Sequence, residues 1–243
     1  MNLSIVIPAY NEAKKIGGDI EAAGVFLYEN QLSGEIIVVD DGSDDETSQT
    51  AQDAAAAAGV EKNVIRLENH RGKGYAVRTG IKQTRGDYVM FADSGLCVPY
   101  HFALRGLELL GSGAVEIAHG SRKLPESVVV HRHFVHRRIS SGLFRRLIVH
   151  YMGAPTEITD SQCGFKMYRG EVGRELYGEC ISDRFVFDVE IILRACKRGY
   201  RIVEFPVEWH SDRDTRFRFF SASIGSLLDL IALKRALGGS VDG

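Results

Sequence analysis

Short apolar runs and helical segments alternate through the first half of the chain. The runs are rich in β-branched residues, which is typical of parallel strands buried on both faces. They cover residues 3–8, 35–40, 63–67 and 88–93. The segments between them predict helices near 13–29, 45–58 and 74–85. This alternation indicates right-handed βαβ crossovers and an open, mostly parallel sheet in an α/β fold.

The second half of the chain is less regular. The pattern of apolar residues predicts, in order, a strand at 115–122, an amphipathic helix at about 134–151, a helix at 187–198, a strand at 200–209 and an amphipathic helix at 221–237.

Polar residues follow each of the first four predicted strands. Turn-forming or acidic side chains occupy the segments 8–12, 40–43, 69–74 and 93–95. Open parallel sheets bind their ligands beyond the carboxyl ends of the strands. The sequence therefore predicts a ligand site at one edge of the sheet.

Asp40 and Asp41 stand where the second strand stops, in VVDDGSDDET. A carboxylate at this point is able to accept the N–H groups of a nucleotide base. Acids in such a segment also serve as turn and helix-capping residues. The residues alone support both interpretations equally.

Lys73 lies between Gly72 and Gly74, just before a predicted helix. Backbone N–H groups at a helix N-terminus and one ammonium group together suit a phosphate. The glycine spacing differs from that of a Walker A loop, and a flexible basic loop is the alternative.

Asp93 ends the fourth strand, at a usual place for a metal ligand in nucleotide enzymes. One or two carboxylates hold Mg²⁺ beside a diphosphate, together with phosphate oxygens and water. The next two positions carry Ser94 and Gly95, where a second acid would be expected. Asp93 is therefore either a one-carboxylate metal ligand or a residue that caps a turn.

A third acidic candidate precedes the Gly-Phe bend of TDSQCGFK, where Asp160 and Gln162 stand. An acid there serves as a base, orients an acceptor, or is a turn aspartate. Cys163 beside them is expected to pack rather than react, because the sequence places no histidine partner next to it.

Composition narrows the function classes. The chain has 243 residues, 44% of them hydrophobic, and a net charge of −2, which does not indicate a nucleic-acid partner. The basic segment 131–146 carries five Arg and three His but lacks aromatic platforms for bases. The four cysteines form no C-x-x-C pair, so neither a zinc site nor a disulfide framework is predicted. Without a signal peptide or an apolar run of bilayer length, we expect a cytoplasmic protein that is at most peripheral to a membrane.

As a set, these segments resemble the family 2 glycosyltransferases with the GT-A fold, most closely their polyprenyl-phosphate (dolichyl-phosphate) branch. The matching segments follow the family's order over most of the chain, and include VIPAYNE (6–12), VVDDGSDDET (38–47), GKGYAVRTG (72–80), TDSQCGFKMY (159–168) and residues 187–209. The resemblance implies one GT-A domain over residues 1–243. Its nucleotide-sugar-binding half would cover about 1–119, and its acceptor-binding half about 120–243.

The resemblance also implies roles for single residues. Asp93 takes the first position of an Asp-x-Asp motif that holds Mg²⁺ or Mn²⁺. The other nucleotide-site residues would be Pro8, Tyr10, Glu12, Asp40, Asp41, Lys73 and Ala92. The catalytic candidates are Asp93, Asp160 and Gln162, the last two where the acceptor meets the sugar. The acceptor phosphate would be bound by Arg122, Arg137 and Ser141.

The sequence departs from the family pattern after Asp93. Gly95 replaces the second acid of the motif in an ungapped alignment, and a shift of two residues would place Asp93 on the second acid instead. One metal carboxylate is missing in either alignment. The C-terminal membrane helices of many bacterial relatives are absent as well.

The first hypothesis is a metal-dependent transfer of a sugar from a nucleotide-sugar donor, UDP-linked in preference to GDP-linked, to a polyprenyl phosphate at the cytoplasmic membrane face. A phosphate acceptor needs cations more than it needs a base, and the arginines of the basic segment suit it. The apolar residues of that segment would let it lie against a bilayer, or alternatively cover the sheet. Two further hypotheses keep the donor: one has a soluble acceptor, and the other is a non-catalytic binder that has lost its metal site.

Overall fold

The computed structural model describes residues 2–130, 144–210 and 219–238. A seven-stranded central sheet has the order β3-β2-β1-β4-β7-β5-β8, and a two-stranded sheet pairs β6 with β9. The strands are β1 (Asn2–Ala9), β2 (Ser33–Asp40), β3 (Glu61–Arg66), β4 (Tyr88–Ala92), β5 (Ile117–Ser121), β6 (Val128–Val130), β7 (Phe165–Arg169), β8 (Ile202–Pro206) and β9 (Glu208–His210). All neighbours in the central sheet run parallel except β7, which is antiparallel to β4 and β5. The predicted mostly parallel α/β sheet is therefore confirmed.

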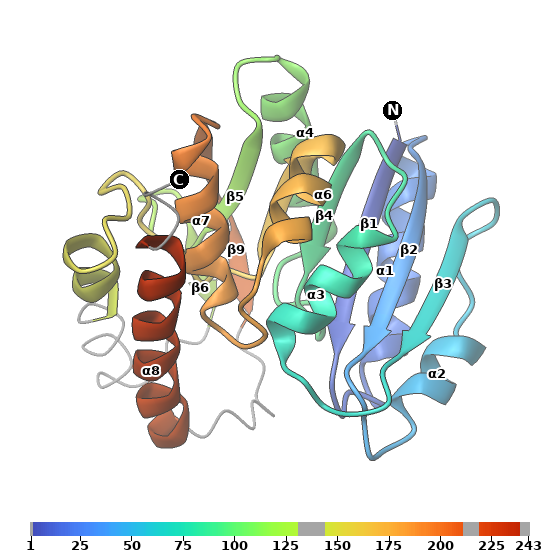
Figure 1. Cartoon of the computed structure of the whole chain (residues 1–243). Helices are drawn as coiled ribbons and strands as arrows, with labels where there is room; N and C mark the ends of the chain where they lie inside the picture. The colour runs from blue at the N-terminus through green and yellow to red at the C-terminus, as the bar shows by residue number, and fades with distance from the viewer. Residues whose placement is uncertain (1, 131–143, 211–218, 239–243) are drawn as a thin grey trace.

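Helices cover both faces of the central sheet (Figure 1). They are α1 (Ile16–Glu29), α2 (Thr47–Asp53), α3 (Lys73–Lys82), the 3-10 helix η1 (Tyr100–Phe102), α4 (Ala103–Gly111), α6 (Gly170–Glu179), α7 (Phe187–Lys197) and α8 (Phe219–Gly238). α1 and α4 pack on one face, and α3, α6 and α7 pack on the other. Each face encloses its own apolar cluster, which explains why the central strands are apolar at nearly every position.

The four strands predicted for the first half match β1 to β4, and their carboxyl ends lie along the lower edge in Figure 1. Ala9 pairs with Asp40, so the ends of β1 and β2 are level. The loops that follow these strands are thereby held side by side, as the site prediction requires.

The helix predicted over 45–58 is too long. α2 ends at Asp53 because Ala54 adopts an extended conformation with ψ 131°. The ammonium of Lys62 donates hydrogen bonds to the carbonyls of Ala51 and Gln52, both at 2.8 Å, and so caps the helix end. The alanine-rich segment then packs as a loop against α1.

The strand predicted over 200–209 is two strands. β8 belongs to the central sheet, whereas β9 pairs with β6, which the sequence did not predict. β7, α4 and α6 were also missed. The predicted helices at 187–198 and 221–237 correspond to α7 and α8.

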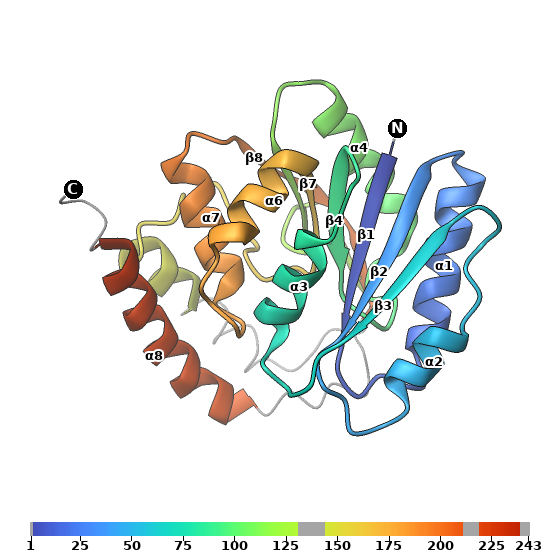
Figure 2. The same ribbon diagram turned by 45° about the vertical axis from the view of Figure 1, so that its right-hand side comes forward.

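A third apolar cluster joins α7 and α8 to a helical segment at residues 144–150. Ile148, Val189, Leu230 and Leu233 form its centre. Figure 2 shows α8 at the opposite end of the molecule from α2. Most of the basic amphipathic helix predicted over 134–151 lies outside the described residues. Within the described ranges, no helix combines the length and apolarity that a membrane crossing requires.

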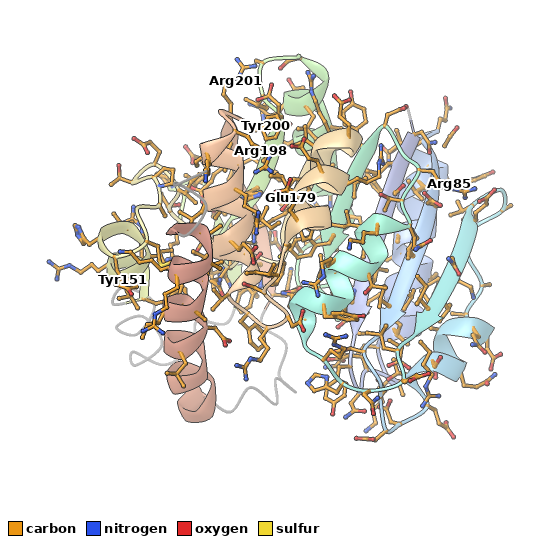
Figure 3. The ribbon with its side chains drawn as sticks, viewed as in Figure 1. Arg85, Tyr151, Glu179, Arg198, Tyr200 and Arg201 are labelled. Carbon is orange, nitrogen blue, oxygen red and sulfur yellow. The ribbon has the colours of Figure 1, made fainter. Side chains whose placement is uncertain are left out.

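Ion pairs tie α6 to α7 and to the segment that follows it, away from the carboxyl ends of β1 to β3 (Figure 3). Arg198 pairs with Glu175 at 2.7 Å and also with Glu179. The hydroxyl of Tyr200 donates to Glu175 at 2.6 Å. These exposed groups stabilise the helix layer and do not face the predicted site.

Candidate active site

The turn after β2 is packed tightly against residues 69–70. Gly42 has φ 69°, and a Cβ at this position would lie 2.5 Å from the carbonyl carbon of Asn69. Only glycine fits both requirements. This contact places the ends of β2 and of the loop before α3 in one cluster.

Asp41 organises that loop. Its buried carboxylate accepts the backbone N–H groups of Arg71, at 2.9 Å, and Gly72, at 2.8 Å. The same group lies 2.8 Å from Nδ1 of His70. Asp41 therefore fixes the conformation of residues 70–72.

One carboxylate oxygen of Asp40 is buried without a hydrogen-bond partner among the described residues. This oxygen is Oδ2, whereas Oδ1 accepts the N–H of Ser43 at 2.9 Å. Nε of Arg66 lies 3.9 Å from Oδ2, beyond hydrogen-bond distance.

Tyr10 and His70 provide an aromatic surface next to Asp41. Their ring centroids are 3.9 Å apart with an interplanar angle of 24°. Tyr10 is 38% exposed, and the side chain of His70 is 50% exposed. The sequence prediction included Tyr10 but missed His70, whose only signal was its place in the loop before α3.

Lys73 and Asp93 form an ion pair at the centre of the strand edge. Lys73 Nζ lies 2.5 Å from Asp93 Oδ1, and the side chains are 19% and 33% exposed. Burial lowers the pKa of Lys73, but the charges of Asp93 and Asp188 outweigh it, and the pKa ends above its ordinary value. Lys73 is therefore a fixed cation at the start of α3.

The bend at Gly164 packs against the Asp93 carboxylate. The N–H of Asp93 donates to the carbonyl of Gly164 at 2.8 Å. A Cβ on Gly164 would lie 2.0 Å from Asp93 Oδ2, so no other residue fits without moving the acid. The bend thus brings the segment 159–164 next to the end of β4.

The loop after Asp93 is anchored from α1. Asp19 is 1% exposed, and its carboxylate accepts the N–H groups of Gly95 and Leu96 at 2.9 Å. Burial raises the pKa of Asp19 to about 6, against the lowering effect of these N–H groups. This contact could not be predicted from the sequence, because Asp19 looks like an ordinary polar residue of a helix.

Arg122 and Asp160 form a second ion pair. Nε and Nη2 of Arg122 donate to the two carboxylate oxygens at 2.7 and 2.8 Å, and the backbone N–H of Arg122 adds a third bond at 3.0 Å. Burial raises the pKa of Asp160, but Arg122 outweighs burial and brings it to about 2. A carboxylate with this pKa is a weak base, so the geometry favours a role in holding Arg122.

Glu204 on β8 holds the same segment from below. Its carboxylate accepts the N–H groups of Thr159 and Asp160 at 2.9 and 2.7 Å, and the Thr159 hydroxyl at 2.7 Å. Arg122 also lies over the Trp209 ring, 5.4 Å from its centroid. The guanidinium is thus fixed by strands and loops that are distant in the sequence.

The remaining residues of the 159–168 segment have different surroundings. Gln162 is partly exposed, and its amide donates a long hydrogen bond of 3.4 Å to the carbonyl of Phe185. Cys163 is fully buried, and burial raises the pKa of its thiol to about 12, which agrees with a packing role. Arg122, Asp160 and Asp93 all act on that pKa, which places the two ion pairs close together.

A third pair lies in the interior below the site. Lys166 contacts Asp188 and donates to the carbonyl of Ser161 at 2.9 Å, and both charged side chains are almost fully buried. Asp188 stands in the first turn of α7, a position where an acid usually interacts with the helix N-terminus. The structure shows that it neutralises Lys166 and acts electrostatically on Lys73.

The other residues predicted for the site lie in different places. Pro8 and Ala92 are buried near the ends of β1 and β4. Glu12 pairs with Lys15 at 3.3 Å. Arg137 and Ser141 lie outside the described residues. The roles assigned to single residues stay predictions.

A divalent metal fits this site only in part. Asp93 supplies one carboxylate, already in contact with Lys73 and Gly164. The described part of the chain contains no group of three His, Cys, Asp or Glu side chains that could hold a metal. Phosphate oxygens and water would have to complete the coordination.

Comparison with known proteins gives a consistent picture. The family model described as "Glycosyl transferase family 2" matches residues 4–176. The chain is 31% identical to glycosyltransferase AglD of Haloferax volcanii. The matched region covers 89% of this chain and 34% of AglD. It is 32% identical to the dolichyl-phosphate beta-glucosyltransferase of Homo sapiens, covering 85% of this chain and 67% of the human one. The Saccharomyces cerevisiae enzyme of the same name is 28% identical, with 96% and 74% covered.

Solved structures share the fold. Glucosyl-3-phosphoglycerate synthase from Mycobacterium tuberculosis, in complex with Mn²⁺, UDP-glucose and phosphoglyceric acid, superposes with a TM-score of 0.70 at 19% identity. The match covers 96% of this chain and 79% of that one. At this identity, the likeness shows the GT-A fold alone.

Proposed function

The chain belongs to glycosyl transferase family 2, and on that premise we propose that it transfers a sugar from a nucleotide-sugar donor to a polyprenyl phosphate. A UDP-sugar is the favoured donor and a GDP-sugar the alternative. The relatives named dolichyl-phosphate beta-glucosyltransferases support the acceptor, since several cover most of this chain. The reaction would take place at the cytoplasmic face of a membrane, with peripheral contact of the chain.

The observation that carries the proposal is the row of side chains along the strand edge. At one end, Tyr10 is 38% exposed and stacks on His70 next to Asp41, a surface that suits a nucleotide base. In the middle, Lys73 and the N-terminus of α3 form a positive region suited to a diphosphate. At the other end, Asp160 holds Arg122. This order matches base, diphosphate and acceptor in a nucleotide-sugar reaction.

In the reaction, a phosphate oxygen of the acceptor attacks the anomeric carbon of the sugar, and the bond from that carbon to the donor diphosphate breaks. The acceptor oxygen is already anionic, so it needs no strong base. Asp160, with its low pKa, would orient Arg122 toward the acceptor. Asp93 would hold Mg²⁺ or Mn²⁺ with the phosphate oxygens. When bound there, the metal would neutralise the charge that develops on the leaving diphosphate.

The two halves of the chain would bind the two substrates. We propose that residues 1–119 bind the nucleotide sugar and that residues 120–243 bind the acceptor. The C-terminal half supplies Arg122 and the segment 159–164, in agreement with that division.

The test is a transfer assay with the purified chain, radiolabelled UDP-glucose and a short-chain polyprenyl phosphate. Label that moves into the organic phase would support the proposal, and GDP-mannose in parallel distinguishes the donors. Phosphoglycerate serves as the soluble acceptor. Transfer to phosphoglycerate but not to the lipid would contradict the lipid acceptor, and no transfer from either donor would contradict the enzymatic proposal for this chain.

A further inference from the structure

The Lys73 ammonium is held in a fixed position by packing around the start of α3. Gly72, just before it, has φ 116°, and a Cβ there would lie 2.7 Å from the carbonyl oxygen of Asp183. A Cβ on Gly74, just after it, would lie 2.6 Å from the carbonyl oxygen of Ser182. The two glycines therefore let the loop before α7 close against the first turn of α3, with Lys73 between them.

Two aromatic rings and one carboxylate surround the Lys73 ammonium. The centroids of Phe91 and Phe187 lie 5.6 and 6.0 Å from Nζ, and Asp93 Oδ1 lies 2.5 Å away. An ammonium has three N–H donors, and the contact with Asp93 uses one. The Lys73 side chain is 19% exposed, which leaves part of it open to a ligand at the strand edge.

One oxygen of the Asp93 carboxylate is paired with a cation, and the other makes a packing contact. Oδ1 contacts Lys73, and Oδ2 packs against Gly164, where a Cβ would lie only 2.0 Å away. Gly95 provides no second acid, and the N–H groups of Gly95 and Leu96 turn inward to Asp19. A metal ion at Asp93 would thus compete with an internal cation that is already in place.

We propose that Lys73, held by Asp93, binds the donor diphosphate directly, so that the chain binds its nucleotide without an obligatory divalent metal. This inference rests on the proposed nucleotide-sugar donor. The carboxylate orients the ammonium, the ammonium neutralises the carboxylate, and its free N–H donors make charge-assisted hydrogen bonds to phosphate oxygens. The N-terminal end of the α3 dipole adds positive potential at the same place.

The experiment is calorimetric titration of UDP and of GDP, which share the diphosphate, into the full chain with EDTA and with Mn²⁺. The parent protein is expected to bind one of them in EDTA. Lys73→Met is expected to weaken binding in EDTA by roughly 10- to 100-fold, the loss typical of a hydrogen bond to a charged group. Mn²⁺ should restore most of that loss, because Asp93 is then free to bind it.

Asp93→Asn tests the other member of the ion pair. It should weaken binding in EDTA by less than Lys73→Met does, because the Lys73 charge remains but loses the carboxylate that orients it, and it should remove any enhancement by Mn²⁺. Lys82→Met, the same substitution at an exposed lysine of the same helix, is the matched control and should change neither titration. The double variant Lys73→Met/Asp93→Asn removes both charges together. It keeps the test usable if either single variant unfolds, and should lose both the binding in EDTA and the effect of Mn²⁺.

The outcomes separate the two proposals. Parent binding that is absent in EDTA and present with Mn²⁺ would overturn the role of Lys73 and leave the proposed function standing. If Lys73→Met loses the same nucleotide affinity with and without Mn²⁺, at an unchanged melting temperature, the exchange between Lys73 and the metal would be overturned. If neither nucleotide binds under any condition, the donor assignment fails, and this inference fails with it.

Discussion

Asp19 makes the stability of the protein depend on pH in a direction that can be measured. The carboxyl is 1% exposed and carries two opposing influences. Burial disfavours its charge, while the N–H groups of Gly95 and Leu96 favour it. The effect of burial is the larger one, so the pKa of Asp19 rises from 3.8 to about 6. Glu12 raises this pKa further by a smaller amount, and Lys15 lowers it.

Proton linkage gives the direction in which the stability changes with pH. Between pH 4 and 6 the folded chain keeps a proton on Asp19 that the unfolded chain has lost, so stability falls as pH rises through this window. Each pKa unit corresponds to about 1.4 kcal/mol. The rise from 3.8 to about 6 therefore makes the Asp19 contribution less favourable by about 2–3 kcal/mol at pH 7 than at pH 4.

Asp19→Asn removes this titration and keeps an oxygen that accepts the N–H groups of Gly95 and Leu96. The free energy of unfolding, measured by urea denaturation at pH 4 and pH 7, should shift in favour of the variant by about 2–3 kcal/mol between the two values. Asp87→Asn, at an exposed aspartate, is the control and should track the parent. A parent that gains stability over the variant as pH rises would show that the N–H groups outweigh burial and would refute the reasoning.

Two further predictions concern the packing and pairing of the site. Gly164→Ala should lower the free energy of unfolding by about 1–3 kcal/mol and weaken nucleotide binding, because its Cβ would meet the Asp93 carboxylate. Thermal melts and UDP titration measure the two effects, and an unchanged melting temperature would contradict the prediction. Arg122→Met should destabilise the chain by about 3 kcal/mol at pH 7, because it leaves the Asp160 charge buried without its partner. Arg122→Met/Asp160→Asn should recover part of that loss in urea denaturation, and a double variant less stable than Arg122→Met would contradict the pairing argument.

The sequence predicted the part of the fold that depends on local periodicity. β1, β2 and β4 contain short apolar runs between polar loops, and such runs have few alternatives to a buried parallel strand, whereas β3 at the sheet edge is only partly buried. The position of the site followed from that, because the loops after Asp40 and Ala92 had to meet at one edge. β7 was missed because it is antiparallel and mixes Lys166 with aromatic residues, so its composition did not show that it is buried.

The side-chain partners within the site could not be predicted in the same way. Lys73 with Asp93, Arg122 with Asp160, and Lys166 with Asp188 each join separate elements, and nothing in the spacing of the residues selects these pairs. They are set by the order of strands in the sheet and by close approaches at Gly72, Gly74 and Gly164. Residue types indicated which chemistry was present, and packing decided which charges meet.

This pairing has a consequence for how the site meets its ligand. Lys73 and Arg122 each have a carboxylate partner, so these two pairs are close to neutral, like the chain as a whole with its net charge of −2. Long-range attraction would then add little to the binding of a diphosphate. The binding free energy must come from exchange of partners at short range, in which phosphate oxygens share an ammonium or a guanidinium that a carboxylate holds in place. The acids Asp93 and Asp160 therefore matter less as bases than as the groups that keep Lys73 and Arg122 oriented toward the ligand.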